Sequence, residues 1–432
     1  MKTLLILLIL SLILSPDFQI VQGLSVLRLD DLIVLFFVVF SLLQKMRTNK
    51  SMFSLDRRVG PLLVIGFVAL FSISFQEIFF DRTVVINDIM IFPMLLKYLL
   101  IYQMGKMAGD EKSIMSYLNI YLVVGLISVV VGIMQYHNIA GVNNWLSPIY
   151  IKDDIKIQSL IDQRLMARAS GTIGDPRQYG YLLVTLLAIL VTFILEKRKR
   201  LFALIGAAVT LTALIYTLSR TAVLVVIIIV AFLIFFNVTY YKSLGNAVKY
   251  SVIVFGAALF TYTYFGTTGF EERVLDTDSV SFESSRYARI RDLRTPIEDV
   301  LDNPQYLLFG KGPSKAYWRS SAHSDYGLML DRFGIIAVAA YLILLWRNLS
   351  ASVKIAKSAR NPDQRIGSMI LAAMVLTWCT YSFAEDIFRN SQLMPINMLM
   401  LGFLAALINT KSKSAIADYR SKRLIKKSNT QT

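Results

Sequence analysis

Apolar runs of near-spanning length recur along the whole chain and alternate with polar segments. Such a run, when it carries few or no charges, predicts a transmembrane helix. The pattern predicts about twelve of them: 2–15, 28–44, 61–79, 86–104, 116–136, 179–195, 201–218, 221–237, 248–267, 326–346, 366–384 and 394–409. We therefore expect residues 1–432 to form a single all-α, polytopic membrane domain.

The first run, residues 2–15, has two interpretations. Lys2 followed by the apolar residues 4–14 resembles the core of a signal peptide, and Val21-Gln22-Gly23 fits a cleavage site. We favour a retained transmembrane helix, because the next apolar run follows closely. The rest of the topology is the same in both cases.

Composition supports this class, and charge sets the orientation. The chain is 55% hydrophobic and 17% charged, with a mean hydropathy of +0.56. If Lys2 is cytoplasmic, the inner segments hold 26 Lys and Arg but six Asp and Glu, and the basic tail 410–432 is one of them. This obeys the positive-inside rule and puts both termini in the cytoplasm. The net charge of +16 is thus a topology signal, and we expect no nucleic-acid partner.

Two connections are much longer than the others, and both are expected outside: residues 138–178 and 268–325. Long loops in compact proteins are usually functional or disordered. The second loop carries helix signals, because Thr295-Pro296-Ile297-Glu298 is a capping box and Arg286–Leu293 can form a helix before it. We expect short helices in this loop.

Both outer loops are rich in arginine, whose guanidinium suits bidentate binding of phosphate. Salt bridges within the loops are the alternative, because the second loop also holds acidic residues. The loop arginines that we select as candidate substrate-binding residues are Arg168, Arg177, Arg289 and Arg319.

Two further arginines lie beside apolar runs. Arg220 follows the turn between two hydrophobic spans, in Leu218-Ser219-Arg220-Thr221, and Arg332 lies about two turns into the span that begins near residue 326. Charges at membrane depth are costly and indicate function by default. The alternatives are snorkelling of Arg220 to headgroup phosphates and a buried pair of Arg332 with Asp331, Glu385 or Asp386.

His323, one of only two histidines, closes the second long loop. Because imidazole titrates near neutral pH, a histidine where this loop meets the bilayer suits proton transfer on a lipid-linked substrate. A structural histidine that caps the loop is the alternative. The two histidines lie on different outer segments and the single cysteine, Cys379, lies in a predicted span. We therefore expect no metal centre and no other cofactor.

Four short motifs follow one another over about residues 165–345. They are Arg168-Ala-Ser-Gly-Thr-Ile-Gly-Asp-Pro-Arg177, then Leu218-Ser219-Arg220-Thr221 with Leu224, then Phe309-Gly310-Lys311-Gly312-Pro313, and last His323-Ser324 followed after nine residues by Gly334. This ordered set resembles the core of the O-antigen ligase and O-antigen polymerase superfamily. Outside it the resemblance is one of topology only.

The resemblance implies a GT-C-like, metal-independent, inverting glycosyltransferase of the bacterial plasma (inner) membrane. Its donor would be an oligosaccharide on undecaprenyl pyrophosphate, with His323 and Arg220 as catalytic residues. The other arginines would bind substrate: Arg168, Arg177, Arg289, Arg319 and Arg332.

The acceptor decides between two enzymes within that superfamily. A polymerase would use a second lipid-linked repeat, and a ligase would use the lipid A-core. We favour the polymerase, because the segment after His323 looks more like that of exopolysaccharide polymerases. A transporter or flippase of lipid-linked or anionic glycans stays open as a different class. Expected partners besides the acceptor glycan are membrane lipids, a chain-length regulator and a flippase.

Overall fold

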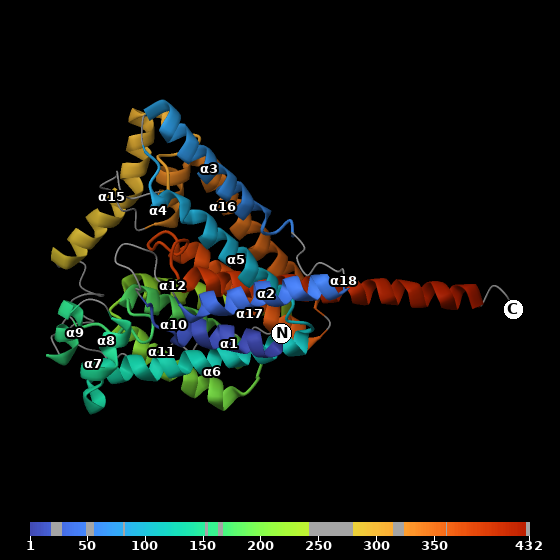
Figure 1. The fold of residues 1–432 in the computed structure, drawn as a ribbon. Helices are drawn as coiled ribbons and strands as arrows, with labels where there is room; N and C mark the ends of the chain where they lie inside the picture. The colour runs from blue at the N-terminus through green and yellow to red at the C-terminus, as the bar shows by residue number, and fades with distance from the viewer. Residues whose placement is uncertain are drawn as a thin grey trace.

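The computed structural model describes residues 1–18, 28–48, 56–80, 83–151, 154–162, 167–241, 280–313, 324–359 and 361–428. Within these ranges the fold is all-helical, as expected, and most helices run side by side in one bundle (Figure 1). The helices of the membrane bundle are α1 (Lys2–Leu14), α2 (Leu29–Thr48), α3 (Gly60–Phe80), α4 (Ile86–Ile89), α5 (Ile91–Lys106), α6 (Glu111–Tyr136), α10 (Pro176–Leu195), α11 (Arg200–Tyr216), α12 (Arg220–Tyr241), α16 (Asp325–Ser358), α17 (Pro362–Tyr381) and α18 (Leu393–Ser428).

Six of the described helices are long and apolar enough to cross a membrane: α3, α6, α10, α12, α16 and α18. The helices α1 and α11 are apolar but shorter. Every predicted span falls on helical residues except 248–267, which lies outside the described residues. The class of a multi-pass helical membrane protein therefore agrees with the structure, and the number of twelve spans stays a prediction.

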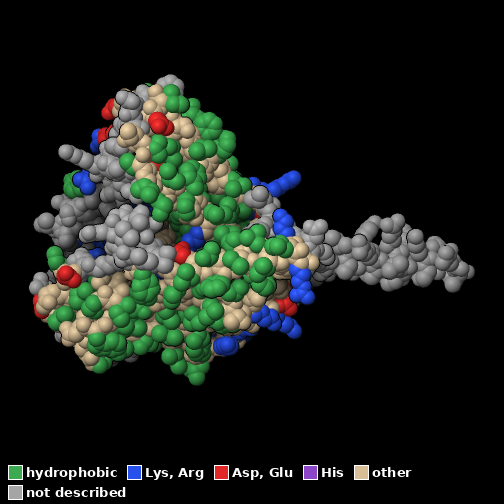
Figure 2. All heavy atoms as spheres, viewed as in Figure 1, with side chains coloured by type: hydrophobic (Ala, Val, Ile, Leu, Met, Phe, Trp, Pro, Cys, Tyr) green, Lys and Arg blue, Asp and Glu red, His purple; other side chains and the backbone are tan. Residues whose placement is uncertain are grey.

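The centre of the bundle is α10, in which 94% of the most apolar stretch is buried. It packs against α6, α11, α12 and α17, and a helix enclosed on all sides is expected to be apolar all round. Figure 2 shows Lys and Arg side chains gathered where α18 leaves the bundle. This is the end that the positive-inside rule predicts to be cytoplasmic.

The first helix is built into the bundle. The side chains of Leu5, Leu8 and Ile9 are fully buried, and α1 packs on α6 and α2. Its last carbonyls accept hydrogen bonds from distant elements, because Thr172 Oγ1 donates to the Ile13 carbonyl (2.6 Å) and Tyr150 Oη to the Leu14 carbonyl (2.9 Å). Residues 2–14 are thus packed into the bundle, and the retained helix stays a prediction.

The helix α16 is bent sharply at Gly334. Asp325 and Tyr341 would lie about 24 Å apart along a straight helix at 1.5 Å per residue, yet Tyr341 Oη donates to Asp325 Oδ2 at 2.6 Å. Gly334 has non-helical torsions (φ 73°, ψ −174°), so the residues before it fold back along those after it. The predicted span 326–346 is therefore interrupted at Gly334. The sequence did not indicate this bend, because one apolar pattern runs through both halves of the helical hairpin.

The Gly310-Lys311-Gly312 turn docks on this bend. Lys311 N donates to the Asp331 carbonyl (2.8 Å) and Gly312 N to the Arg332 carbonyl (3.0 Å), in place of the bonds of a continuous helix. A Cβ atom on Gly310 would lie 2.4 Å from Arg332 C, and one on Gly334 would lie 2.3 Å from the Leu308 carbonyl oxygen. Both positions also have positive φ, which favours glycine. The motif Phe309–Pro313 and the motif that ends at Gly334 thus pack directly against each other.

The two long outer loops contain helices as well as turns where they are described. The first holds η1 (Ile139–Gly141), α7 (Val142–Trp145), α8 (Ser147–Tyr150) and α9 (Asp154–Ile161). The second holds one helix of 23 residues, α15 (Val280–Asp302), and the 3-10 turn η3 (Pro304–Tyr306). The prediction of two short helices that meet at Pro296 is wrong, because α15 is one helix across this residue. An interior proline removes an N–H donor, and its ring clashes with the carbonyl four residues before it, yet α15 continues through Pro296.

Candidate functional site

Three helix ends meet at the outer side of the bundle. Asp175 caps the start of α10, because its Oδ1 accepts from Arg177 N (2.8 Å) and Gln178 N (3.3 Å). Tyr381, the last residue of α17, donates from Oη to the Arg177 carbonyl (2.9 Å). A Cβ atom on Gly180 would lie 2.7 Å from Tyr381 Oη and 2.9 Å from Ala222 Cβ of α12. The starts of α10 and α12 and the end of α17 are therefore in direct contact.

The turn that presents Arg220 is held by the segment containing Arg168. Arg168 Nε donates to the Thr217 carbonyl (2.7 Å) and Ala169 N to the Tyr216 carbonyl (2.9 Å). Leu218 in this turn has a positive φ of 48°, a strained conformation for a branched side chain that persists only when its surroundings impose it. The two arginine-containing motifs of the sequence are thus physically joined.

Arg177 lies in the first turn of α10 and faces Glu385. Its Nε is 3.8 Å from Glu385 Oε1, which is beyond hydrogen-bonding distance, and its side chain is 40% exposed. The Glu385 side chain is only 9% exposed. The site therefore combines an accessible guanidinium with a buried carboxylate behind it.

Sequence reasoning missed the connection between α17 and α18, residues 382–392. Its Ser382 carbonyl accepts from Ser324 Oγ (3.0 Å) and Asp325 N (2.9 Å), and Phe388 N donates to Asp325 Oδ1 (2.8 Å). The start of α16 is thereby fixed to the end of α17, close to Glu385 in the chain. The adjacent acids Glu385 and Asp386 were the available signal, but we had considered them only as partners of Arg332.

The predicted site residues divide into three groups. Arg168, Arg177 and Arg220 come together at the starts of α10 and α12. His323, Arg319 and the side chain of Arg289 lie outside the described residues.

Arg332 lies elsewhere, at the bend of α16. Its side chain is 1% exposed and its Nε is 3.1 Å from Asp331 Oδ2. Asp331 also faces Lys311 Nζ (3.0 Å). The buried pair with Asp331 is thus the interpretation that agrees with the structure, and we leave Arg332 out of the candidate site.

The other histidine is close to the site's supporting residues. His137 Nε2 lies 3.0 Å from Tyr216 Oη, and Tyr216 packs face to face on Tyr136 with ring centroids 4.1 Å apart. Tyr216 is also the residue whose carbonyl holds Ala169. Among the described residues, no group of three or more His, Cys, Asp or Glu side chains is placed to hold a metal ion.

Helix starts and arginines of the site suit an anion, beside the carboxylates of Asp175 and Glu385. Helices α10, α12 and α16 all begin at this end of the bundle, and a helix start carries a partial positive charge. Arg177 and Arg220 lie in the first turns of two of them.

A comparison of the sequence with known protein families and with curated proteins found no match. The likeness to the O-antigen ligase and polymerase superfamily therefore stays a resemblance.

Proposed function

We propose that the protein is a glycosyltransferase on the outer face of the bacterial plasma membrane. It would join oligosaccharide repeats carried on undecaprenyl pyrophosphate, as a polysaccharide polymerase. The observation that supports this most is the gathering of Arg168, Arg177 and Arg220 where two helices begin. A pyrophosphate at this place would meet guanidinium groups and the positive ends of the helices together.

The chemistry needs two functions from the protein. The acceptor hydroxyl oxygen attacks the anomeric carbon as the bond from that carbon to the pyrophosphate oxygen breaks, and the configuration inverts. The leaving pyrophosphate must be stabilised as an anion, which we assign first to Arg220 and then to Arg177. The hydroxyl proton must go to a base, which we assign to His323. Ser324, the next residue, donates from Oγ to the Ser382 carbonyl just after α17 (3.0 Å).

Surface glycan from a deletion strain carrying plasmid-borne variants tests this function. Loss of a polymerase leaves one-repeat glycan, loss of a ligase leaves bare lipid A-core, and unaltered glycan contradicts both. Because removal of one charge-stabilising donor typically costs about 100-fold or more in rate, Arg177→Ala is expected to abolish long glycan on a gel. His323→Ala is expected to do the same.

Two further variants make the test specific. Arg177→Lys keeps the charge but loses the bidentate geometry, so it is expected to restore little polymer. Arg294→Ala removes an arginine of the same outer loops that is 71% exposed, and it should leave polymer length unchanged. Wild-type polymer from Arg177→Ala or His323→Ala, at equal protein level in the membrane, would contradict the assigned role of that residue.

A further inference from the structure

The outer helix α15 has three distinct sides. Pro296 and Val300 are buried, and α15 packs on α16. Three apolar residues are exposed on a second side: Ile290, Ile297 and Leu301. At 100° per residue they fall within about 40° of one another around the axis. The contact with α16 therefore leaves one apolar strip of α15 exposed.

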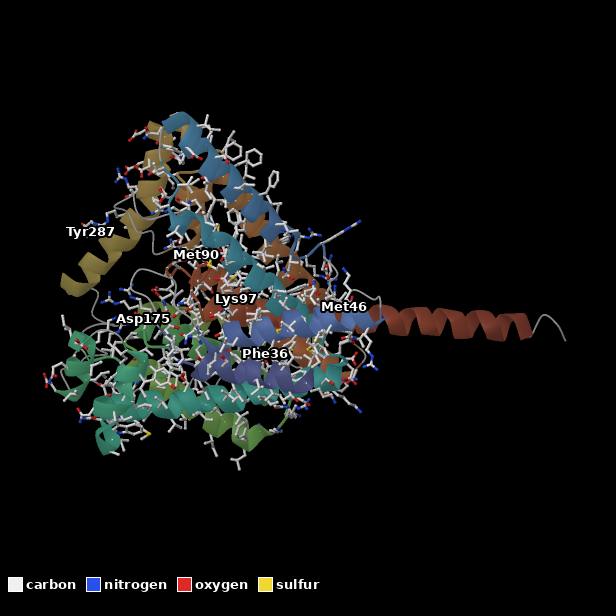
Figure 3. All side chains as sticks on the ribbon, viewed as in Figure 1. Phe36, Met46, Met90, Lys97, Asp175 and Tyr287 are labelled. Atoms are coloured by element: carbon white, nitrogen blue, oxygen red, sulfur yellow. The ribbon has the colours of Figure 1, made fainter. Side chains whose placement is uncertain are left out.

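The third side is charged. Arg291, Arg294 and Glu298 are exposed and follow one another around the axis beyond the apolar strip. Tyr287 lies on the charged side, between Arg294 and Glu298 around the axis, and is 67% exposed; Figure 3 places it at the outer rim of the molecule. An apolar strip beside a side with basic and aromatic residues is typical of a helix that lies in a membrane interface.

The segment that follows α15 contacts an apolar surface of α3. Leu307 and Leu308, just after α15, are exposed, and the Phe309 ring stacks on Phe71 of α3 with centroids 5.7 Å apart. Phe71 belongs to a candidate membrane span whose outward residues, such as Phe67, are exposed and apolar. The end of α15 is therefore close to the exposed apolar side of α3.

The direction of α15 fits the same arrangement. Figure 1 shows α15 at the outer end of the bundle, inclined to α6 instead of running along it. Exposed in water, its contiguous apolar strip would be an unusual surface for a soluble loop.

We propose that α15 is an interfacial helix that binds the outer leaflet of the membrane. Ile290, Ile297 and Leu301 lie at the boundary of the acyl chains, and Arg291 and Arg294 lie at the level of the lipid phosphates. The occupant of this surface is phospholipid, not a second protein chain. The inference concerns the membrane contact alone and stands independently of the proposed function.

Spin-label accessibility in liposomes tests this placement. In a Cys379→Ser background, single cysteines replace Ile290, Ile297 and Leu301, and matched ones replace Arg291, Arg294 and Glu298. The labelled full-length protein is reconstituted in phosphatidylethanolamine and phosphatidylglycerol. The first set should be reached severalfold better by oxygen, which concentrates in lipid, than by a water-soluble nickel chelate. The second set should show the reverse. A label replacing Phe67 gives the reference for lipid, and one replacing Lys112, an exposed residue in the first turn of α6, gives the reference for water.

Either of two results overturns the proposal. Labels of both sets that are equally open to the nickel chelate place α15 in water. Labels of the apolar set that are shielded from both reagents place it against protein. Each variant is first required to elute as the parent does on size exclusion, so that misfolding is not read as a change of environment.

Discussion

Arg28 and Arg177 both lie near the outer end of the bundle, but they differ in burial and in the distance to their acidic partners. The Arg28 side chain is 0% exposed, with Nε 2.8 Å from Asp30 and Nη1 2.7 Å from Asp17. Arg177 has a carboxylate at 3.8 Å and is 40% exposed. A guanidinium enclosed by short contacts holds its helices together, whereas one with a loose contact and open access is available to a ligand.

The cluster around Arg28 explains what such enclosure does. Arg28 Nη2 also donates to the Ser11 and Leu12 carbonyls at the end of α1 (3.2 and 3.4 Å). Lys97 of α5 adds a second cation, with Nζ 2.5 Å from Asp30 Oδ2. The charges thereby connect α1, α2 and α5, and removal of one leaves buried partners uncompensated.

The largest effect is expected from Arg28→Ala. It removes the guanidinium from Asp30, from Asp17 and from the Ser11 and Leu12 carbonyls together. Asp30, whose side chain is 0% exposed, keeps Lys97 as its remaining cation, so we expect a loss at the lower end of the about 3–5 kcal/mol of a broken buried pair. We expect a clear loss of thermal stability of the purified protein and of its level in the membrane. Arg47→Ala, at the exposed opposite end of α2, is the matched control. Equal melting temperatures for the two variants would show that the Arg28 contacts contribute little.

A smaller effect is expected from Lys311→Met. The Lys311 ammonium is 6% exposed and faces Asp299 of α15 and Asp331 of α16. Asp331 keeps Arg332 as a partner and Asp299 is 35% exposed, so we expect a loss of about 1–3 kcal/mol instead of the full cost of a broken pair. Faster hydrogen exchange at the end of α15 is the measurement that locates the effect.

Lys156→Met is the control for that variant. Lys156 is 47% exposed and lies 3.5 Å from Asp175, so its loss should change neither stability nor exchange in α15. If Lys311→Met behaves in the same way, burial is not what distinguishes the two lysines.

The sequence predicted the helices well, because apolar runs of spanning length leave few other structures possible in a bilayer. It predicted neither the bend of α16 nor the continuity of α15. Gly334 stands within one apolar pattern that suits a straight helix and a hairpin equally, and only the docking of residues 307–312 decides between them. Pro296 is a strong local signal for a boundary, but the packing of α15 on α16 overrides it.

The candidate site was predictable in part. The motifs with Arg168, Arg177 and Arg220 were selected from the sequence because they lie in an outer loop or beside the outer end of a predicted span, and the structure brings them to the starts of α10 and α12. Glu385 was one of three acids offered as partners of Arg332, and it lies beside Arg177 instead, because a single sequence does not tell which helix ends meet. Arg28 was not singled out at all. A lone arginine beside an apolar run looks the same whether it is enclosed by acids, as here, or half-exposed.

The smallest loss of stability is expected from Arg294→Ala. Arg294 is 71% exposed, and its Nε lies 2.5 Å from Glu298 Oε1, one helical turn away in α15. A short distance does not by itself make such a pair strong: exposed i,i+4 pairs contribute about 0.3–0.5 kcal/mol, because water and salt screen both charges. We expect the melting temperature to stay within about a degree of wild type and the small difference to vanish at high salt. A loss comparable with that of Arg28→Ala would show that distance, and not enclosure, decides what an arginine contributes in this protein.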